Sequence, residues 1–299
     1  MNRSGQLGLL IALSSLLVCR LHGQMPLSSA KSSCSLSGVP AKGAGNLSDG
    51  DLLALYNAQS DLVNSLAGDA LVSATAMKRR GGSARMVAAT IQFQAPALLR
   101  MTGFVPFLGS REFDLASDGH EFRLLIPVDR KMKFFVGPVD APATSTDAKQ
   151  NLRPQPIIDA FHWPRGELDA SAGARLSSRM SRTLNLLLSD ASGKRRKGRV
   201  KFDMATGTVS SLEVSSPEFG LVIKIRYGDW EEVENISDNV ARCYPRQITI
   251  SQPKDGVILE LQILHSALNA QISAARFVLN PPRGISVVSL NLSGGADAP

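Results

Sequence analysis

The sequence has few of the residues from which enzymes build metal and redox sites. Of its 299 residues only four are histidine and three are cysteine, and no cysteine pair has the spacing of zinc ligands. There is no Gly-x-Ser-x-Gly elbow and no phosphate-binding loop. His120-Glu121 begins like a zinc-protease helix, but Leu124 stands where that motif needs its second histidine. These absences predict a protein that is not an enzyme and that holds no metal and no cofactor.

The other candidates for acid-base chemistry have structural explanations. His162 lies beside Trp163 at the end of an apolar stretch, which favours a packed helix end over a catalytic base. Asp114 and Asp118 lie near His120, at an expected hairpin where aspartate is favoured for its turn geometry.

Aromatic residues are also scarce, at 5%, and the positive charge is not arranged for nucleic acid. The formal charge is +7, and 31 basic against 26 acidic side chains leave +5 after residue 23, a mild excess that suits anionic lipid surfaces. No basic helix and no interleaving of aromatic with basic residues is found, so no nucleic-acid partner is expected. The basic run Lys194–Lys197 falls between two expected strands and predicts a solvated hairpin tip.

Only one long apolar run occurs, and it lies at the N-terminus. Residues 1–23 read as a signal peptide, with Arg3 as the positive start and an apolar core from Leu7 to Cys19 that is too short to cross a bilayer. Cleavage before Gln24 is one interpretation. Lipidation of Cys19 is the other, although Val18 departs from the lipoprotein pattern. We expect an exported protein of the periplasm or the outer membrane.

Residues 24–47 are rich in serine, glycine and alanine, which predicts a flexible tether. Without Cys19, the remaining cysteines are Cys34 and Cys243, and export allows them to pair. The alternative is two unrelated thiols, one of them in a mobile arm, and we favour this alternative.

The stretch from Arg85 to Val136 consists of short strands separated by turns. In residues 87–93 every second position is apolar, which is typical of a half-buried strand. Asp118-Gly119 and, later, Asp255-Gly256 supply the positive φ angles of tight hairpins. Similar alternation continues to residue 263 and gives ten or eleven antiparallel strands. The pattern predicts a mainly β (α+β) fold built on one large, curved sheet.

Two helices are expected beside this sheet. Ser48-Asp49-Gly50-Asp51 has the spacing of a capping box, and apolar residues follow at helical intervals over residues 48–66, with Gly68 as the stop. A strand is expected from Ala70 to Lys78. A second, short helix is expected over residues 155–163, and residues 165–181 are interpreted as a mobile excursion. These helices are too few to seal the apolar face of so many strands.

The run FQAPALLRMTGFVPFLGSREFDLASDGHEFRLLIP resembles the LolA/LolB-type lipoprotein carriers and sorting proteins of the bacterial envelope. YGDW at 227–230, YPRQITI at 244–250 and LNAQISAARFVLNPPRG at 268–284 are similar to the closing strands and tail of that family. The segment NLRPQPIIDAF at 151–161 resembles its helix between the two halves of the sheet. The resemblance implies an unclosed antiparallel β-barrel whose concave face, under a helical lid, shelters acyl chains.

This resemblance defines the candidate domain and its site. Residues 48–292 are expected to form the lipid-binding half-barrel and residues 293–299 a disordered tail. The expected lipid-lining residues, taken from the apolar set of each strand, are Val87, Ile91, Phe93, Leu99, Met101, Phe113, Leu115, Phe122, Leu124 and Ile126. Phe107 and Leu108 stand where the outer-membrane member of the family carries a protruding apolar loop. Alternatively, both side chains tuck under the sheet.

Two functions from different classes remain. In the first, the protein shelters acyl chains for lipoprotein sorting or delivery, with lipids or acylated lipoproteins as partners and peripheral contact with the outer membrane. In the second, it is a non-catalytic structural or scaffolding envelope protein that binds a protein partner through its sheet. A monomer is expected in the first case.

Overall fold

The computed structural model describes residues 34, 44–77, 86–106, 108–141, 145, 148–172, 178–189, 193, 195–217 and 220–290. All of them belong to one compact unit, residues 32–299. The expected signal peptide with Cys19, the loop residue Phe107 and the expected tail 293–299 lie outside the described residues.

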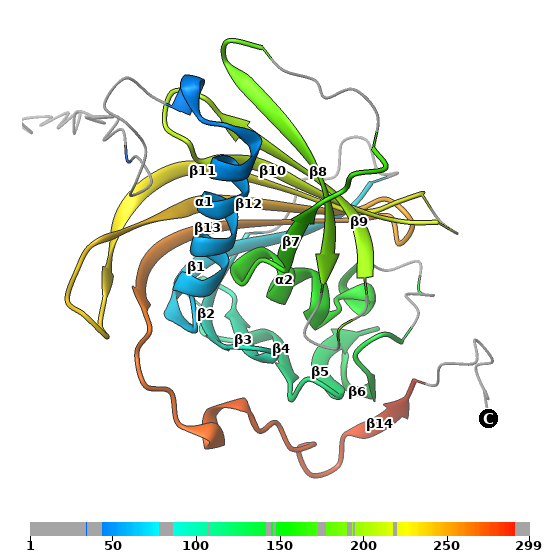
Figure 1. The fold of residues 1–299 in the computed structure, drawn as a ribbon. Helices are drawn as coiled ribbons and strands as arrows, with labels where there is room; N and C mark the ends of the chain where they lie inside the picture. The colour runs from blue at the N-terminus through cyan, green and yellow to red at the C-terminus, as the bar shows by residue number, and fades with distance from the viewer. Residues whose placement is uncertain are drawn as a thin grey trace, which may run out of the picture. The chain divides into compact units, whose positions relative to one another are not determined.

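The described chain forms one sheet of fourteen strands (Figure 1). The strands are β1 (Ser65–Ala76), β2 (Val87–Gln94), β3 (Leu98–Phe104), β4 (Arg111–Ser117), β5 (Glu121–Val128), β6 (Lys131–Pro138), β7 (Arg165–Leu168), β8 (Ser181–Ser189), β9 (Arg195–Asp203), β10 (Val209–Ser216), β11 (Gly220–Asn235), β12 (Arg242–Gln252), β13 (Val257–Leu268) and β14 (Ser286–Ser289).

Their order across the sheet is β14-β6-β5-β4-β3-β2-β1-β13-β12-β11-β10-β9-β8-β7. Neighbouring strands are antiparallel, except that β14 runs parallel to β6 and the end of β11 runs parallel to β13. The end strands β14 and β7 do not pair with each other, so the sheet stays unclosed. The predicted mainly β fold, an unclosed antiparallel barrel with few helices, is confirmed. The expected number of strands, ten or eleven, was too low, and two of the fourteen, β7 and β14, have only four residues each.

Helix α1 (Asp49–Leu62) begins at the predicted capping box. The Asp51 amide donates to Ser48 Oγ at 3.1 Å, and the Ser48 amide donates to Asp51 Oδ2 at 2.8 Å. These hydrogen bonds satisfy backbone donors that have no partner within the first helical turn. No helix among the described residues is long and apolar enough to span a bilayer.

The predicted end of this helix was wrong, because Gly68 is not a helix stop. The helix ends at Leu62, and Gly68 lies inside β1, next to a shift in the register between β1 and β13. A Cβ atom on Gly68 would lie 2.2 Å from the backbone oxygen of His265 in β13. The glycine is therefore required by the close approach of two strand backbones.

Helix α2 (Pro154–Phe161) lies close to its predicted position, and Pro154 and Pro156 fit its first turn. Three short 3-10 helices cover Ala44–Asn46, Ala148–Asn151 and Ala274–Phe277. The segment 165–181 is not wholly an excursion, since it contains β7 and the start of β8.

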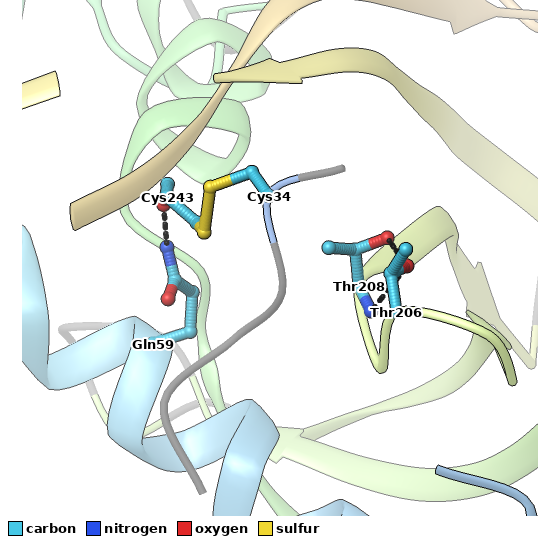
Figure 2. Close-up of a disulfide and its surroundings, with 5 residues drawn as sticks. All are labelled: Cys34, Gln59, Thr206, Thr208 and Cys243. Atoms are coloured by element: carbon cyan, nitrogen blue, oxygen red, sulfur yellow. Dashed lines mark hydrogen bonds between the residues drawn. A yellow bond between two sulfur atoms is a disulfide. The ribbon is translucent and has the colours of Figure 1, made fainter. Parts of the chain in front are cut away.

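The N-terminal arm is attached at two points, one in strand β12 and one in the turn after β9. Cys34 forms a disulfide with Cys243 in β12, with the two Cα atoms 5.8 Å apart (Figure 2). Our preference for two unrelated thiols was therefore wrong. Ala44 is buried, and its amide donates to the carbonyl of Met204 at 2.8 Å. The segment that we expected to be a flexible tether is thus fixed at these residues.

The sheet has an inner and an outer face, and part of it is buried on both. The main core lies on the inner face, and it includes side chains of α1 and α2. On the outer face of β4 to β6 a second, small cluster consists of Ala116, Leu125, Phe134 and Leu279. Leu279 comes from the C-terminal segment, which continues into β14 along the edge of β6 (Figure 1).

Candidate functional site

The ten expected lipid-lining residues all belong to the main core on the inner face. None exposes more than 7% of its surface. They come from the adjacent strands β2, β3, β4 and β5, and the strand register sets them side by side: Ile91 is opposite Met101, Met101 is opposite Leu115, and Leu115 is opposite Leu124. Side chains at such opposite positions touch across the sheet. The sequence therefore encodes one continuous apolar surface on four strands.

Side chains of α2 cover this surface in the structure. Ile157, Ile158 and Phe161 are each at most 2% exposed and belong to the same core. The ring of Phe161 lies 6.2 Å from the ring of Phe93, centroid to centroid. Two surface hollows found among the described residues lie elsewhere, and none of the ten residues lines them. The ten side chains are thus buried against other side chains of the protein.

Arg153, directly before α2, is a buried cation that donates hydrogen bonds to backbone oxygens. Its guanidinium lies 4.8 Å from the centroid of the Phe122 ring and donates to the carbonyls of Ala141, Gln150 and Leu152 at 2.9 to 3.0 Å. Burial lowers the pKa of Arg153 to about 10, and the charge of Asp255 opposes this shift. The guanidinium therefore stays charged at neutral pH and fixes the start of α2.

A second buried charge lies on α2 itself. Asp159 is 3% exposed, accepts a hydrogen bond from Gln155 Nε2 at 2.7 Å, and lies 3.5 Å from Arg196 Nη2 in β9. Arg196 is part of the basic run that we expected at a hairpin tip. That interpretation was wrong for residues 195–197, since β9 begins at Arg195 and Arg196 points to the inner face.

Helix α1 is joined to the residues that follow α2. Tyr56 Oη donates to the carbonyl of Pro164 at 2.8 Å, and Ser60 Oγ donates to the carbonyl of Trp163. The His162 ring nitrogen Nδ1 donates to the carbonyl of Val63 at 2.9 Å. These contacts between residues about 100 positions apart couple α1 to the end of α2.

An aromatic cluster fills the space between α1, the end of α2 and β11. Trp163 stacks on Tyr56 at 5.3 Å between centroids and also contacts Tyr227, at 5.3 Å, and Trp230, at 6.3 Å. Burial raises the pKa of Tyr56 and of Tyr227 well above the usual value, and the nearby Asp159 raises both further. The phenols therefore stay neutral and serve as hydrogen-bond donors.

The loop between β3 and β4 carries an exposed apolar residue. Leu108 exposes 75% of its surface, so it does not tuck under the sheet. The amide of Val105 donates to the carbonyl of Ser110 at 2.9 Å, and Gly109 has a φ of +63°, which together close the loop. Phe107 lies outside the described residues, and the transfer role of the loop stays a prediction.

The candidates for acid-base chemistry lie on separate elements. His120 is in the β4–β5 turn, His162 follows α2, and His265 is in β13. Asp118 accepts the amides of His120 and Glu121, as expected of a turn residue. Asp114 does not fit that interpretation, because it is fully buried in β4 and pairs with Arg100. Among the described residues no group of histidine, cysteine and carboxylate side chains could hold a metal ion.

Sequence reasoning missed several of these contacts. It did not find the Asp159–Arg196 pair, the aromatic cluster or the backbone contacts of Arg153. One signal was present: an aspartate in the middle of the apolar stretch IIDAF, where a buried carboxylate needs a buried partner. Its partner, 37 positions further on in a basic run, could not be identified from spacing.

The fold and the buried inner face define a class of protein: an open antiparallel sheet with helices against one face. Solved structures with a similar fold include a LolA superfamily protein from Nitrosomonas europaea, at 12% identity and a TM-score of 0.49, covering 77% of this chain and 97% of that one. A DUF1329 family protein from Desulfovibrio piger has 12% identity and a TM-score of 0.45, with 76% and 95% covered.

A domain assigned to an outer membrane lipoprotein-sorting protein from Vibrio parahaemolyticus has 12% identity and a TM-score of 0.45, with 76% and 94% covered. No protein-family model and no curated protein matches the chain. One of these three is a LolA superfamily protein, the group that the sequence resemblance names. Because all three TM-scores are below 0.5, nothing about function follows from them.

Proposed function

We propose that this protein shelters the acyl chains of lipids or lipoproteins against its inner face, for lipoprotein sorting or delivery to the outer membrane. The observation that carries the proposal is the continuous apolar surface of ten buried side chains on β2 to β5. A surface of this kind binds acyl chains by burial and needs no polar anchor. In this proposal the inner face must open to admit an acyl chain.

In this proposal α2 is the lid. Moving it away would expose Ile157, Ile158 and Phe161, which costs about 5 to 9 kcal/mol at about 1.5 to 3 kcal/mol for each side chain. An acyl chain of about fifteen methylenes gains about 12 kcal/mol on burial, at about 0.8 kcal/mol for each. For a chain that enters from water, the gain exceeds the cost of exposing these three side chains.

The Asp159–Arg196 pair fits a lid that must open. Burying two charges costs desolvation energy that offsets most of their attraction, so a buried pair adds little net stability. When the lid opens, both charges return to water and recover that cost. The pair therefore fixes where α2 docks on β9 while adding little to the energy of opening.

Uptake of a fluorescent fatty acid tests the proposal with a matched pair of variants. Met101 is 1% exposed on the inner face, and Leu125 is 2% exposed in the outer-face cluster. Met101→Gln should weaken uptake about tenfold, because its amide would be buried against the acyl chain. Leu125→Gln should destabilise the fold to a similar degree but leave the affinity of the folded protein unchanged. Equal affinities in the two variants would contradict the proposal.

Mass spectrometry of protein purified from membranes provides the second test. Phospholipid or acylated peptide in the purified protein supports the proposal. A lipid-free protein with a stoichiometric protein partner would instead support the structural or scaffolding function.

The anchoring state belongs to the same proposal and needs its own test. We propose an exported protein at the periplasm or outer membrane, with lipidation of Cys19 as one of the two alternatives. Labelling with radioactive palmitate should be lost in Cys19→Ala if this cysteine is lipidated. Labelling of neither protein would leave signal-peptide cleavage before Gln24.

A further inference from the structure

The outer face of β9 presents a cation at four successive outward positions. Arg195, Lys197, Arg199 and Lys201 are exposed, whereas the alternate residues Gly198, Val200 and Phe202 are buried on the inner face. In a strand, alternate residues point to the same side and are about 6.7 Å apart along the chain. The four cations therefore form a row about 20 Å long.

Two more cations, Lys224 and Arg226, lie on β11, which is separated from β9 by the single strand β10. Lys224 is opposite Glu213 of β10, and Glu213 is opposite Arg199 of β9. The Glu213 carboxylate lies 2.7 Å from Lys224 Nζ and 3.7 Å from Arg199 Nη1. The Glu213 carboxylate therefore forms ion pairs with a cation on each of the two neighbouring strands.

Two residues further along β9, at Lys201, no carboxylate occupies the corresponding position on β10. Ser211 of β10 lies opposite both Lys201 and Arg226, so a hydroxyl takes the place that Glu213 has between Arg199 and Lys224. Among the described residues, no carboxylate forms an ion pair with Lys201 or Arg226. The nearest acid along β9, Asp203, accepts the amide of Ala205 at 2.7 Å within its own turn.

A hollow lies over these residues. Besides Glu213 and the four cations at 199, 201, 224 and 226, the hydroxyl-bearing residues Thr183, Ser210 and Ser211 line it. Cations and hydroxyls are donors that suit phosphate oxygens. Figure 1 shows β8 to β11, which carry the hollow, as neighbouring strands of the sheet.

We propose that this outer face of β8 to β11 binds the phosphate groups of an anionic phospholipid surface, with Lys201 and Arg226 as its central contacts. The four cations on β9 extend over about 20 Å, which is longer than one phosphate group. Several headgroups of a membrane surface could contact them at the same time. A single-stranded nucleic acid fits less well, because the hollow offers no aromatic side chain on which bases could stack. This site lies on the face opposite to the acyl-binding surface, so either proposal can fail without the other.

Vesicle sedimentation with the full chain tests the proposal. The vesicles contain phosphatidylcholine with phosphatidylglycerol, or phosphatidylcholine alone. The variant Lys201→Gln/Arg226→Gln should bind anionic vesicles on the order of 25-fold more weakly, at about 5-fold for each cation removed. The matched control is Lys131→Gln/Arg283→Gln, which removes one lysine and one arginine at exposed positions elsewhere and should bind as the unchanged protein does.

Measurements of salt dependence and of thermal unfolding complete the test. Binding to anionic vesicles should fall steeply as salt rises, because screening shortens from about 10 Å at 0.1 M to about 3 Å at 1 M. Thermal unfolding midpoints should stay the same in both variants, which verifies that they are folded whether or not the protein takes up fatty acid.

Several results would overturn the proposal. One is equal binding of anionic vesicles by the Lys201/Arg226 variant and the control. Another is equal binding of the unchanged protein to phosphatidylcholine alone. Two further results would assign the site to another ligand: a thermal shift with inorganic phosphate that depends on Lys201 and Arg226 without vesicle binding, or binding of a labelled oligonucleotide with the same dependence.

Discussion

Removing the disulfide between Cys34 and Cys243 should lower the free energy of unfolding by about 2 to 5 kcal/mol. The two cysteines are 209 positions apart, so the cross-link closes a very long loop in the unfolded chain. Loop-closure entropy gives about 5 kcal/mol for a loop of that length, and native disulfides typically contribute about 2 to 4 kcal/mol. The upper figure applies if the unfolded chain has no residual structure.

Urea unfolding followed by circular dichroism measures this effect. The variant Cys34→Ser/Cys243→Ser should unfold at lower urea than the oxidised protein, and the reduced protein should coincide with the variant. The slope of the free energy against urea should rise without the cross-link, because the unfolded chain then exposes more surface.

A local control separates the cross-link from its neighbours. Gln59 Nε2 of α1 donates to the carbonyl of Cys243 at 3.0 Å (Figure 2). Gln59→Ala removes this hydrogen bond alone and should cost about 1 kcal/mol. Identical unfolding midpoints for the oxidised protein and the double serine variant would refute the reasoning. So would alkylation of both cysteines in the folded, unreduced protein.

Three further outcomes are expected. Gly68→Ala should destabilise the protein by about 2 to 4 kcal/mol in thermal or urea unfolding, because its Cβ would meet the backbone of His265. The control is Gly228→Ala, also in a strand, which should be nearly neutral because a Cβ on Gly228 comes no closer than 3.7 Å to another atom. Equal effects would contradict the close approach. The three tyrosines of the chain, Tyr56, Tyr227 and Tyr244, are buried and have raised pKa values. Their contribution to the free energy of unfolding is therefore complete below pH 10 and is lost as the pH rises above it. Tyrosinate absorbance should increase only together with unfolding, and a normal titration in the folded state would contradict their burial. Leu108→Glu should reduce transfer of bound lipid to liposomes while uptake stays unchanged, and unaltered transfer would remove the loop from the proposed function.

Features set by a few consecutive residues could be predicted from the sequence. The alternation of β2 was correct, since Val87, Ala89, Ile91 and Phe93 are buried and the residues between them are not. Both Asp-Gly turns were correct, with φ of +92° at Gly119 and +66° at Gly256. In each case the local backbone geometry depends on the side chains within the segment itself.

Features set by contacts between distant residues could not be predicted. Gly68 was interpreted as a helix stop because its close neighbour, the His265 oxygen, is nearly 200 positions away. Asp114 was interpreted as a turn residue because its partners depend on the register of β3 and β4. The pairing of Cys34 with Cys243 depends in the same way on where β12 lies in the sheet.

The same limit applies to the candidate site. The apolar alternation identified ten residues that share one face, because the period of a strand is fixed. Whether a lipid or the protein's own helix covers that face depends on α2, whose position is set by Asp159 and Arg196 from elements far apart in the chain.

The way in which β7 ends the sheet bears on how this protein behaves at high concentration. Gly166 of β7 donates its amide to Asn57 Oδ1 at 2.9 Å and accepts from Asn57 Nδ2 at 3.0 Å, so one carboxamide on α1 replaces the strand that would otherwise continue the ladder. At the opposite margin, β14 occupies the hydrogen-bonding side of β6. A terminal strand with free amides and carbonyls invites a second molecule to add itself, which leads to fibrils. The β7 margin is blocked by α1, and at the other margin only the four-residue strand β14 is left as an edge, which is too short to offer a long template. Asn57→Leu should therefore promote aggregation before it causes unfolding.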